Sequence, residues 1–289
     1  MTNNNRLTIM SVFDGISCGQ IALERAGIEI NKYYASEIKK YAIKVTQEHY
    51  PNTIQLGDIT KIDFKKFEGE IDLLLGGSPC QNLSNARSSH CNIKDGLKGT
   101  KSKLFYEFYR CLTEITPTYF LFENVLMDKN DENIITDLLK VTPIQINSNL
   151  VSFQNRKRLY WTNIPNITIP LDKNINFQHF KDTNTTYCDK FIVKKTPSRL
   201  KMWGNGEGEC PNITYKTKIN CITKNQDRWK NSGLIEYKDF CRYLTTNELE
   251  IAQTLPKGYT SCLSKRQSED VIGDGWTVDI IVHIFKGLK

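Results

Sequence analysis

The sequence contains no CxxC pair, and its four histidines are not clustered. Structural zinc sites need such closely spaced ligands, so the sequence predicts no metal site. No apolar run approaches the length of a membrane-spanning helix, and the start of the chain lacks the apolar core of a signal peptide. There is also no internal repeat. The sequence therefore predicts a globular protein without a membrane partner.

The nine cysteines form no repeating framework of the kind that disulfide-rich secreted domains show. This pattern favours free thiols in a reducing environment and a cytoplasmic location. The formal net charge of +7 fits a polyanionic partner and, equally well, a solvated basic surface.

The first half of the chain alternates short apolar segments with segments of helical periodicity. This alternation predicts an α/β fold with a mostly parallel sheet covered on both faces. Strands are expected at residues 7–13, 33–37, 54–59, 71–75 and 119–122. Helices are expected at residues 19–26, 39–50 and 104–115.

The composition changes after Trp161, where Asn, Thr, Lys and Gly become frequent and the periodicity weakens. Long structureless loops are uncommon in compact domains. Residues 162–239 are therefore interpreted as a small, irregular, β-containing domain rather than one long insertion, with strands expected at 190–194 and 219–223. Helical spacing returns at residues 245–255 and 277–285.

Two expected strands end in side chains that could act on one substrate. The dipeptide Pro79-Cys80 follows an apolar run and two glycines, and Glu123 ends a second apolar run. Open α/β sheets bind ligands at the carboxyl ends of their strands. A thiolate there is a potential nucleophile and a carboxyl a potential acid. A buried structural cysteine is the alternative for Cys80.

Three earlier strand ends favour an adenosine-containing cofactor. Gly15 lies in a turn between a strand and a helix, Glu37 ends the second strand, and Asp58 follows the third. A glycine turn lets a ligand approach the backbone, and an acid about twenty residues later can bind ribose hydroxyls. These residues fit S-adenosylmethionine and a nicotinamide dinucleotide alike.

Taken together, these motifs resemble those of the cytosine-5 DNA methyltransferase family. The matching segments occur in the family's order and are residues 13–15, Glu37, 57–59, 76–81, 123–125 and 154–158. Residues 103–110 and 273–281 are most similar to the de novo branch of the eukaryotic enzymes. Arg242, with Thr245 and Glu248, resembles the family element that organises the target-recognition domain.

The resemblance implies a Rossmann-like sheet that binds S-adenosylmethionine, with a smaller target-recognition domain. The implied boundaries are 1–161 for the catalytic domain, 162–245 for the recognition domain and 246–289 for C-terminal helices that pack back on the catalytic domain. The implied catalytic residues are Cys80, Glu123, Arg156 and Arg158. The implied cofactor-binding residues are Phe13, Asp14, Gly15, Ile16, Glu37, Ile38, Asp58, Ile59, Gly77, Pro79, Asp274, Gly275 and Trp276. The expected DNA contacts are Ser84, Arg87, Lys98, Lys224 and Arg228.

The activity that the resemblance implies is methyl transfer to carbon 5 of cytosine in double-stranded DNA. Cys80 would add to carbon 6 of a base flipped out of the duplex, and Glu123 would hold ring nitrogen 3. Arg158, together with Arg156, would bind the carbonyl oxygen or support the Cys80 loop electrostatically. The enzyme would belong to a restriction-modification system, act alone or be phage-borne. Methylation of RNA is the nearest alternative. A nicotinamide-dependent oxidoreductase and an inactive DNA-binding protein fit fewer of the motifs.

Overall fold

The computed structural model describes residues 6–79, 103–203, 211–226 and 233–289. The chain divides into two compact units. Unit 1 comprises Met1–Ile146, Lys157–Ile169 and Ile281–Lys289, and unit 2 comprises Asn147–Arg156 and Pro170–Ile280. Unit 2 thus includes residues 246–280, which the sequence grouped with the C-terminal helices of the catalytic domain. The functional identity of each unit stays a prediction.

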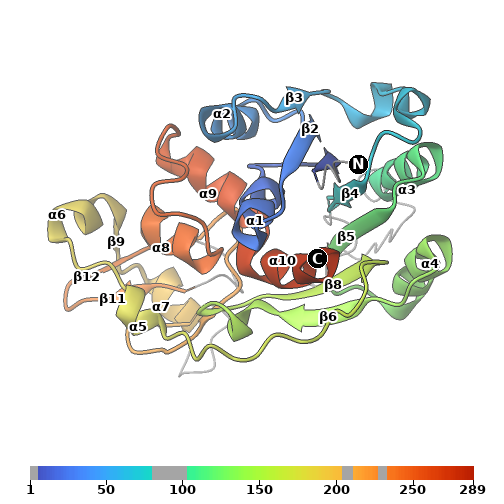
Figure 1. Ribbon diagram of the computed structural model, residues 1–289. Coiled ribbons are helices and arrows are strands. Elements are labelled where there is room, and N and C mark those ends of the chain that lie inside the picture. The colour runs from blue at the N-terminus through green and yellow to red at the C-terminus, as the bar shows by residue number, and fades with distance from the viewer. Residues whose placement is uncertain (1–5, 80–102, 204–210, 227–232) are drawn as a thin grey trace. The chain divides into compact units, whose positions relative to one another are not determined.

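A sheet of seven strands, in the order β3-β2-β1-β4-β5-β8-β6, forms the centre of unit 1 (Figure 1). Its strands are β1 (Leu7–Val12), β2 (Ile30–Ser36), β3 (Ile54–Gln55), β4 (Leu73–Gly76), β5 (Tyr119–Val125), β6 (Ile144–Asn147) and β8 (Lys157–Thr162). The first five strands pair in parallel, whereas β8 runs antiparallel to β5. The α/β fold is therefore confirmed, with a mixed sheet. The strand order reverses between β1 and β4, which is where open sheets bind ligands.

Helices cover both faces of this sheet, as expected for strands that are apolar on both sides. The helices are α1 (Cys18–Ala26), α2 (Lys40–His49), α3 (Leu104–Ile115) and α4 (Lys129–Leu139), and α10 (Val278–Phe285) ends in unit 1. Leu74 belongs to the apolar cluster formed with α3 and α4. Its neighbour Leu75 lies against α1, since a Cβ on Gly19 would be 2.9 Å from the Leu75 side chain.

Aromatic rings fill the core between α3 and the sheet. The Phe122 ring centroid lies 4.7 Å from that of Phe108, 5.3 Å from that of Phe105 and 5.7 Å from that of Trp161. A Cβ on Gly76 would be 2.6 Å from the Phe108 ring, so only glycine lets α3 approach the end of β4 this closely. This packing holds the last residue of β4 in place.

The third strand is shorter than its predicted range of 54–59. Gly57 adopts a left-handed conformation, with φ of 77°, which is incompatible with a continuing strand. Asp58 then accepts a hydrogen bond from the Thr60 N–H and so starts a short 3-10 helix at Ile59–Lys61. Asp58 therefore lies at a helix cap after β3.

Unit 2 consists of short elements, as its irregular composition predicts. They are β7 (Gln154–Asn155), α5 (Phe177–Phe180), α6 (Thr185–Cys188), β9 (Ile192–Lys194), α7 (Pro197–Trp203), β10 (Ile219–Asn220), β11 (Ile235–Glu236), β12 (Phe240–Arg242), α8 (Thr246–Ala252) and α9 (Lys265–Asp274). One small sheet joins β11, β12 and β9 in antiparallel fashion, and β10 pairs in parallel with β7. The strands expected at 190–194 and 219–223 are shorter in the structure: β9 begins only at Ile192, after a 3-10 helix at Asp189–Phe191, and β10 comprises Ile219–Asn220 alone.

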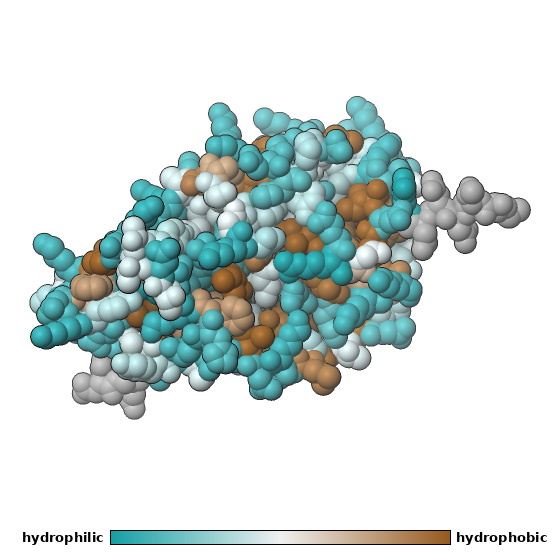
Figure 2. Space-filling view, turned by 60° about the vertical axis from the view of Figure 1, so that its left-hand side comes forward, coloured by the Kyte–Doolittle hydropathy of each residue, from teal (hydrophilic) through white to brown (hydrophobic). Residues whose placement is uncertain are grey.

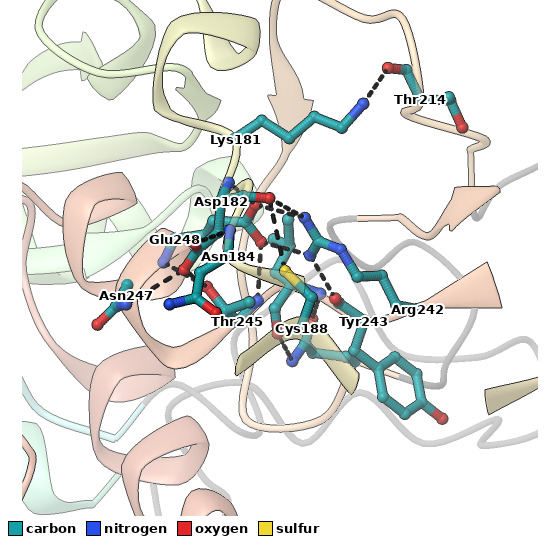
Figure 3. A network of polar contacts seen from close by, with 12 residues as sticks. Lys181, Asp182, Asn184, Cys188, Thr214, Arg242, Tyr243, Thr245, Asn247 and Glu248 are labelled. Carbon is teal, nitrogen blue, oxygen red and sulfur yellow. Dashed lines mark hydrogen bonds and ion pairs between the residues drawn. The ribbon is translucent and has the colours of Figure 1, made fainter. Parts of the chain in front are cut away.

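A buried ion pair in unit 2 joins β12 to α8 (Figure 3). The two terminal guanidinium nitrogens of Arg242 each donate to a Glu248 carboxylate oxygen at 2.8 Å, and both side chains are fully buried. Burial alone would lower the pKa of Arg242, but the Glu248 carboxylate more than offsets this and raises it. Glu248 also accepts the backbone N–H groups of Asp182 and Thr245, at 2.8 Å each. The pair thus fixes the start of α8 to the chain before α6.

Hydrophobic residues on the face drawn in Figure 2 occur as small separate groups among hydrophilic ones. Within the described ranges, no helix is both long and apolar enough to span a membrane. Nor do the described residues contain a group of three or more His, Cys, Asp or Glu side chains placed to hold a metal ion.

Candidate active site

The turn between β1 and α1 has an unusual backbone. Phe13, Gly15 and Ser17 all have positive φ, at 59°, 61° and 55°. A Cβ on Gly15 would meet no atom within 4 Å, so the turn faces open space at this residue. Such a turn, placed before the first residues of a helix, lets a ligand come close to backbone N–H groups.

Side-chain hydrogen bonds stabilise the conformation of this turn. The carboxylate of Asp14 accepts hydrogen bonds from the Ser17 hydroxyl and, at 2.8 Å, from the Tyr33 hydroxyl on β2. Desolvation raises the pKa of Asp14, and these two hydrogen bonds oppose that rise. Asp14 was predicted from the sequence, whereas Tyr33 and Ser17 were not. Tyr33 lies on a strand adjacent to β1, so its position could have been inferred from the sheet order.

Glu37 follows β2 and connects the turn after β2 to the turn after β1. Its Oε2 accepts the Gly15 N–H at 2.9 Å, and its Oε1 accepts the N–H groups of Ile38 and Lys39 at 2.8 and 2.9 Å. The Ile38 side chain next to it is 72% exposed, which is high for an isoleucine. A carboxylate fixed beside an exposed apolar side chain can bind a ligand with a hydroxyl-bearing part and a flat apolar part.

Asp58 adds a second carboxylate after the next strand. Its Oδ1 accepts the Thr60 N–H at 3.0 Å and the Thr60 hydroxyl at 2.8 Å. The backbone bond from Thr60 lowers the pKa of Asp58, so the group is an acceptor at neutral pH. Ile59 after it is buried, as is Ile16 in the first turn. Ile16 and Ile59, both predicted to bind the cofactor, therefore have side chains that pack in the protein interior behind these turns.

The turn after β4 is tied to the end of β5. The Asn124 side-chain amide donates to the Ser78 hydroxyl at 3.2 Å and to the Ser78 carbonyl at 3.4 Å. Its own oxygen accepts the Val125 N–H at 2.8 Å. Asn124 therefore positions the backbone immediately before Pro79. Asn124 belongs to the matching segment 123–125, but its contact with Ser78 was not predicted. An amide side chain at the end of a strand next to β4 was the signal that could have indicated it.

Glu123 and Arg158 form a largely buried ion pair between β5 and β8. The Arg158 Nε lies 2.9 Å from the Glu123 Oε1, with 14% and 11% of the side chains exposed. Glu123 lies opposite Tyr160 in the antiparallel register, so Arg158 is its diagonal neighbour on the same face of the sheet. The structure thus brings together two predicted catalytic residues that are 35 positions apart in the sequence.

Several predicted site residues lie outside the described residues. These are Cys80, Ser84, Arg87, Lys98 and Arg228. Gly77 and Pro79 are described and lie in the turn that leads to Cys80.

Arg156 lies in unit 2, where both terminal nitrogens of its guanidinium donate hydrogen bonds. It donates to the carbonyl groups of Ile222, Gly273 and Gly275 at 3.2, 3.3 and 3.0 Å, and to the Cys221 sulfur at 3.4 Å. Only 4% of the residue is exposed. These contacts indicate that Arg156 joins the segment after β10 to the segment after α9. Its predicted catalytic contact stays a prediction.

The remaining predicted residues of unit 2 are also near one another. The Lys224 Nζ lies 2.7 Å from Asp274 and 3.8 Å from Asp270. Lys224 is thus paired with acids, which weakens its expected contribution to DNA binding. Gly275 accepts from Arg156 and, at 2.8 Å, from Gln253, and Trp276 beside it is half-buried.

Comparison with known proteins identifies the family to which this chain is similar. Residues 7–160 match the family model described as C-5 cytosine-specific DNA methylase. The orphan methyltransferase M.Rho11sI of Bacillus phage rho11s is 37% identical over 169 residues, which are 54% of this chain and 32% of that protein. The type II methyltransferase M.NgoPII of Neisseria gonorrhoeae is 30% identical over 205 residues, or 67% of this chain and 57% of that protein. The chain spans about a third of the length of the first relatives it matches.

Solved structures match nearly the whole chain at low identity. The Entamoeba histolytica methyltransferase EhMeth has a TM-score of 0.77 and 19% identity, over 98% of this chain and 99% of its own. The S. pombe Dnmt2 methyltransferase has a TM-score of 0.75 and 14% identity, over 97% of this chain and 98% of its own. The predicted methyltransferase fold is confirmed by this likeness. The similarity to the de novo branch stays a prediction.

Proposed function

Since the chain belongs to the C-5 cytosine-specific DNA methylase family, we propose that it transfers a methyl group from S-adenosylmethionine to carbon 5 of cytosine in double-stranded DNA. The observation that carries this proposal is the buried Glu123–Arg158 ion pair at the end of β5. It lies on the strand whose Asn124 holds the turn leading to Cys80. These contacts support a site in which Cys80 would be the nucleophile, Glu123 the acid and Arg158 the cation.

The turns after β1, β2 and β3 suit the adenosine part of the cofactor. Glu37 would accept from ribose hydroxyls, Asp58 from the adenine amino group, and Ile38 would pack against the adenine ring. The open space in front of Gly15 and Gly57, where a Cβ would meet no atom within 4 Å, supports this assignment. When bound, S-adenosylmethionine supplies an electrophilic methyl group on a positively charged sulfur.

The side chains at β4 and β5 suit the cytosine. Addition of the Cys80 thiolate to carbon 6 forms a carbon–sulfur bond and makes carbon 5 nucleophilic. Glu123 would hold nitrogen 3 and stabilise the proton there, with Arg158 orienting it and binding the carbonyl oxygen. Carbon 5 would take the methyl group with S-adenosylhomocysteine as the leaving group. Loss of the carbon 5 proton to solvent would then re-form the ring double bond, break the carbon–sulfur bond and regenerate the Cys80 thiolate. A duplex base must first leave the stack.

The direct test is a substrate comparison. The full chain is incubated with labelled S-adenosylmethionine and either duplex DNA or RNA, and the products are digested to nucleosides. We expect label in 5-methyldeoxycytidine. Label in RNA cytosine alone would favour the RNA alternative, and no label in either polymer would refute the proposal.

Glu37→Ala and Asp58→Ala are each expected to weaken cofactor binding. Each change removes a carboxylate acceptor, which corresponds to about 1–3 kcal/mol. The effect should be larger for Glu37, because its carboxylate also fixes the Gly15 N–H. Calorimetric titration with S-adenosylhomocysteine measures this. Asp63→Ala is the control, since it removes an exposed carboxylate that lies 3.7 Å from the Lys66 Nζ. Unchanged affinity in both test variants would mean that the cofactor binds elsewhere.

Glu123→Gln is expected to lower the rate of methyl transfer by about 10²–10⁴-fold, since an amide cannot protonate the ring. Affinity for S-adenosylhomocysteine should be unchanged. A matched control is Glu107→Gln, which removes a carboxylate that pairs with Arg110 at 2.8 Å on α3. Single-turnover methylation assays compare the variants. Equal rates for the two variants would contradict the role of Glu123.

A further inference from the structure

One turn of unit 2 combines a fixed backbone with an exposed aromatic side chain. Residues 213–217, here called the Tyr215 turn, connect the segment after α7 to β10. Ile213 and Thr214 are buried, whereas Tyr215 is 89% exposed and Lys216 is exposed beside it. Large aromatic side chains rarely remain this exposed on a protein surface.

The backbone of the Tyr215 turn is held from two sides. The Thr214 hydroxyl donates to the Asn212 side chain at 2.6 Å and accepts the Glu236 N–H at 2.8 Å. From the other side, Lys181 donates to the Thr214 carbonyl at 3.1 Å and Gln178 to the Lys216 carbonyl at 2.7 Å. Figure 3 shows Lys181 reaching Thr214. Because the turn is already ordered, presenting Tyr215 to a partner loses little conformational entropy.

The charges around the turn favour an anionic partner. Lys216 is exposed at the turn itself. His179 and Phe180 lie between Gln178 and Lys181, the two residues whose side chains hold the turn, and Phe180 is 38% exposed. The nearby Glu236 carboxylate is already paired with a cation, since the Lys195 Nζ lies 2.8 Å from it.

We propose that the Tyr215 turn is a DNA-docking element, an inference that rests on the proposed function. Tyr215 packs against a base or deoxyribose of the duplex, and Lys216 neutralises an adjacent phosphate. Aromatic faces beside cations are a common way of binding nucleic acid, because every nucleotide has an apolar face and a charged phosphate. The sequence indicates Lys216 as one of several basic residues that could neutralise phosphates, and it gives no role to Tyr215.

The test measures DNA binding by fluorescence anisotropy, with labelled random-sequence duplexes and the full chain. Tyr215→Ala is expected to weaken binding about tenfold, and Tyr215→Phe to bind like the wild type because the ring is retained. Lys216→Ala should reduce the slope of log affinity against log salt by about one, as the loss of one phosphate contact requires. The matched control is Leu171→Ala, which truncates another side chain of unit 2 that is also 89% exposed.

The outcomes separate this inference from the proposed function. Weaker binding by Tyr215→Ala alone, with unchanged affinity for S-adenosylhomocysteine, supports the docking role even if no methylated cytosine forms. Equal binding by Tyr215→Ala, Leu171→Ala and wild type overturns it, even if the wild type methylates DNA. If the wild-type protein binds no duplex DNA, the inference is also overturned, and the exposed Tyr215 ring would then be a contact for a protein partner.

Discussion

Cys80→Ser is expected to abolish methyl transfer and to leave affinity for S-adenosylhomocysteine unchanged. A serine hydroxyl is far less nucleophilic than a thiolate, and losing the nucleophile of a covalent mechanism lowers turnover by up to about 10⁶-fold. The cofactor turns do not depend on this side chain, since Glu37 and Asp58 are held by neighbouring N–H groups. Methyl transfer and calorimetric titration are measured separately.

The covalent bond itself can be tested with duplex DNA that contains 5-fluorocytosine. S-adenosylmethionine is included, because the thiolate addition reverses until carbon 5 is methylated. Once it is methylated, fluorine at carbon 5 cannot leave as a proton does, so the carbon–sulfur bond persists and a protein–DNA adduct survives denaturing electrophoresis. We expect the adduct with wild type and with Cys262→Ser, which changes a half-exposed cysteine outside the motifs. Adduct formation by Cys80→Ser, or substantial residual transfer by it, would remove Cys80 from the mechanism.

Arg242→Met is expected to lower the free energy of unfolding by about 3–5 kcal/mol, because it leaves the buried Glu248 carboxylate without its cation. Urea denaturation followed by circular dichroism measures this. Lys195→Met is the matched control. It removes a cation that pairs with Glu236, whose side chain is 37% exposed, and should lower the free energy of unfolding by less than about 1 kcal/mol.

The double variant Arg242→Met with Glu248→Leu separates charge from packing. Replacing both partners removes the uncompensated charge, so stability should recover in part. Recovery is incomplete because Glu248 also accepts the N–H groups of Asp182 and Thr245. A double variant as unstable as Arg242→Met would show that the loss comes from packing rather than from the unpaired carboxylate.

Residues at strand ends could be predicted from the sequence because apolar runs mark buried parallel strands. The helix at 104–115 was predicted with the bounds that α3 has, since its apolar positions recur at helical spacing. Helix α9 was missed because only Ser268, Val271 and Ile272 of its ten residues are buried, which leaves a weak apolar stripe. Strand β8 was missed because its first residues are charged.

Side-chain partners could not be predicted, because they depend on distances between elements. The Glu123–Arg158 pair requires the antiparallel register of β5 and β8. Arg156 and Arg158 are two residues apart and were expected to act together. In the structure Arg158 pairs with Glu123 in unit 1, while Arg156 bonds to carbonyl groups of unit 2. The boundary between the units falls between them, at a position without a composition change.

That boundary restricts how the protein can be recombined with its relatives. The chain passes between the two units after residues 146, 156, 169 and 280, so unit 2 is an interrupted module. A chimera that exchanges only residues 170–280 would leave Gln154 and Arg156 of the host beside foreign partners in place of Ala252, Ile222 and Gly275. Transplanting residues 147–156 together with 170–280 preserves these bonds, so an exchange of unit 2 between relatives requires both segments to be replaced together.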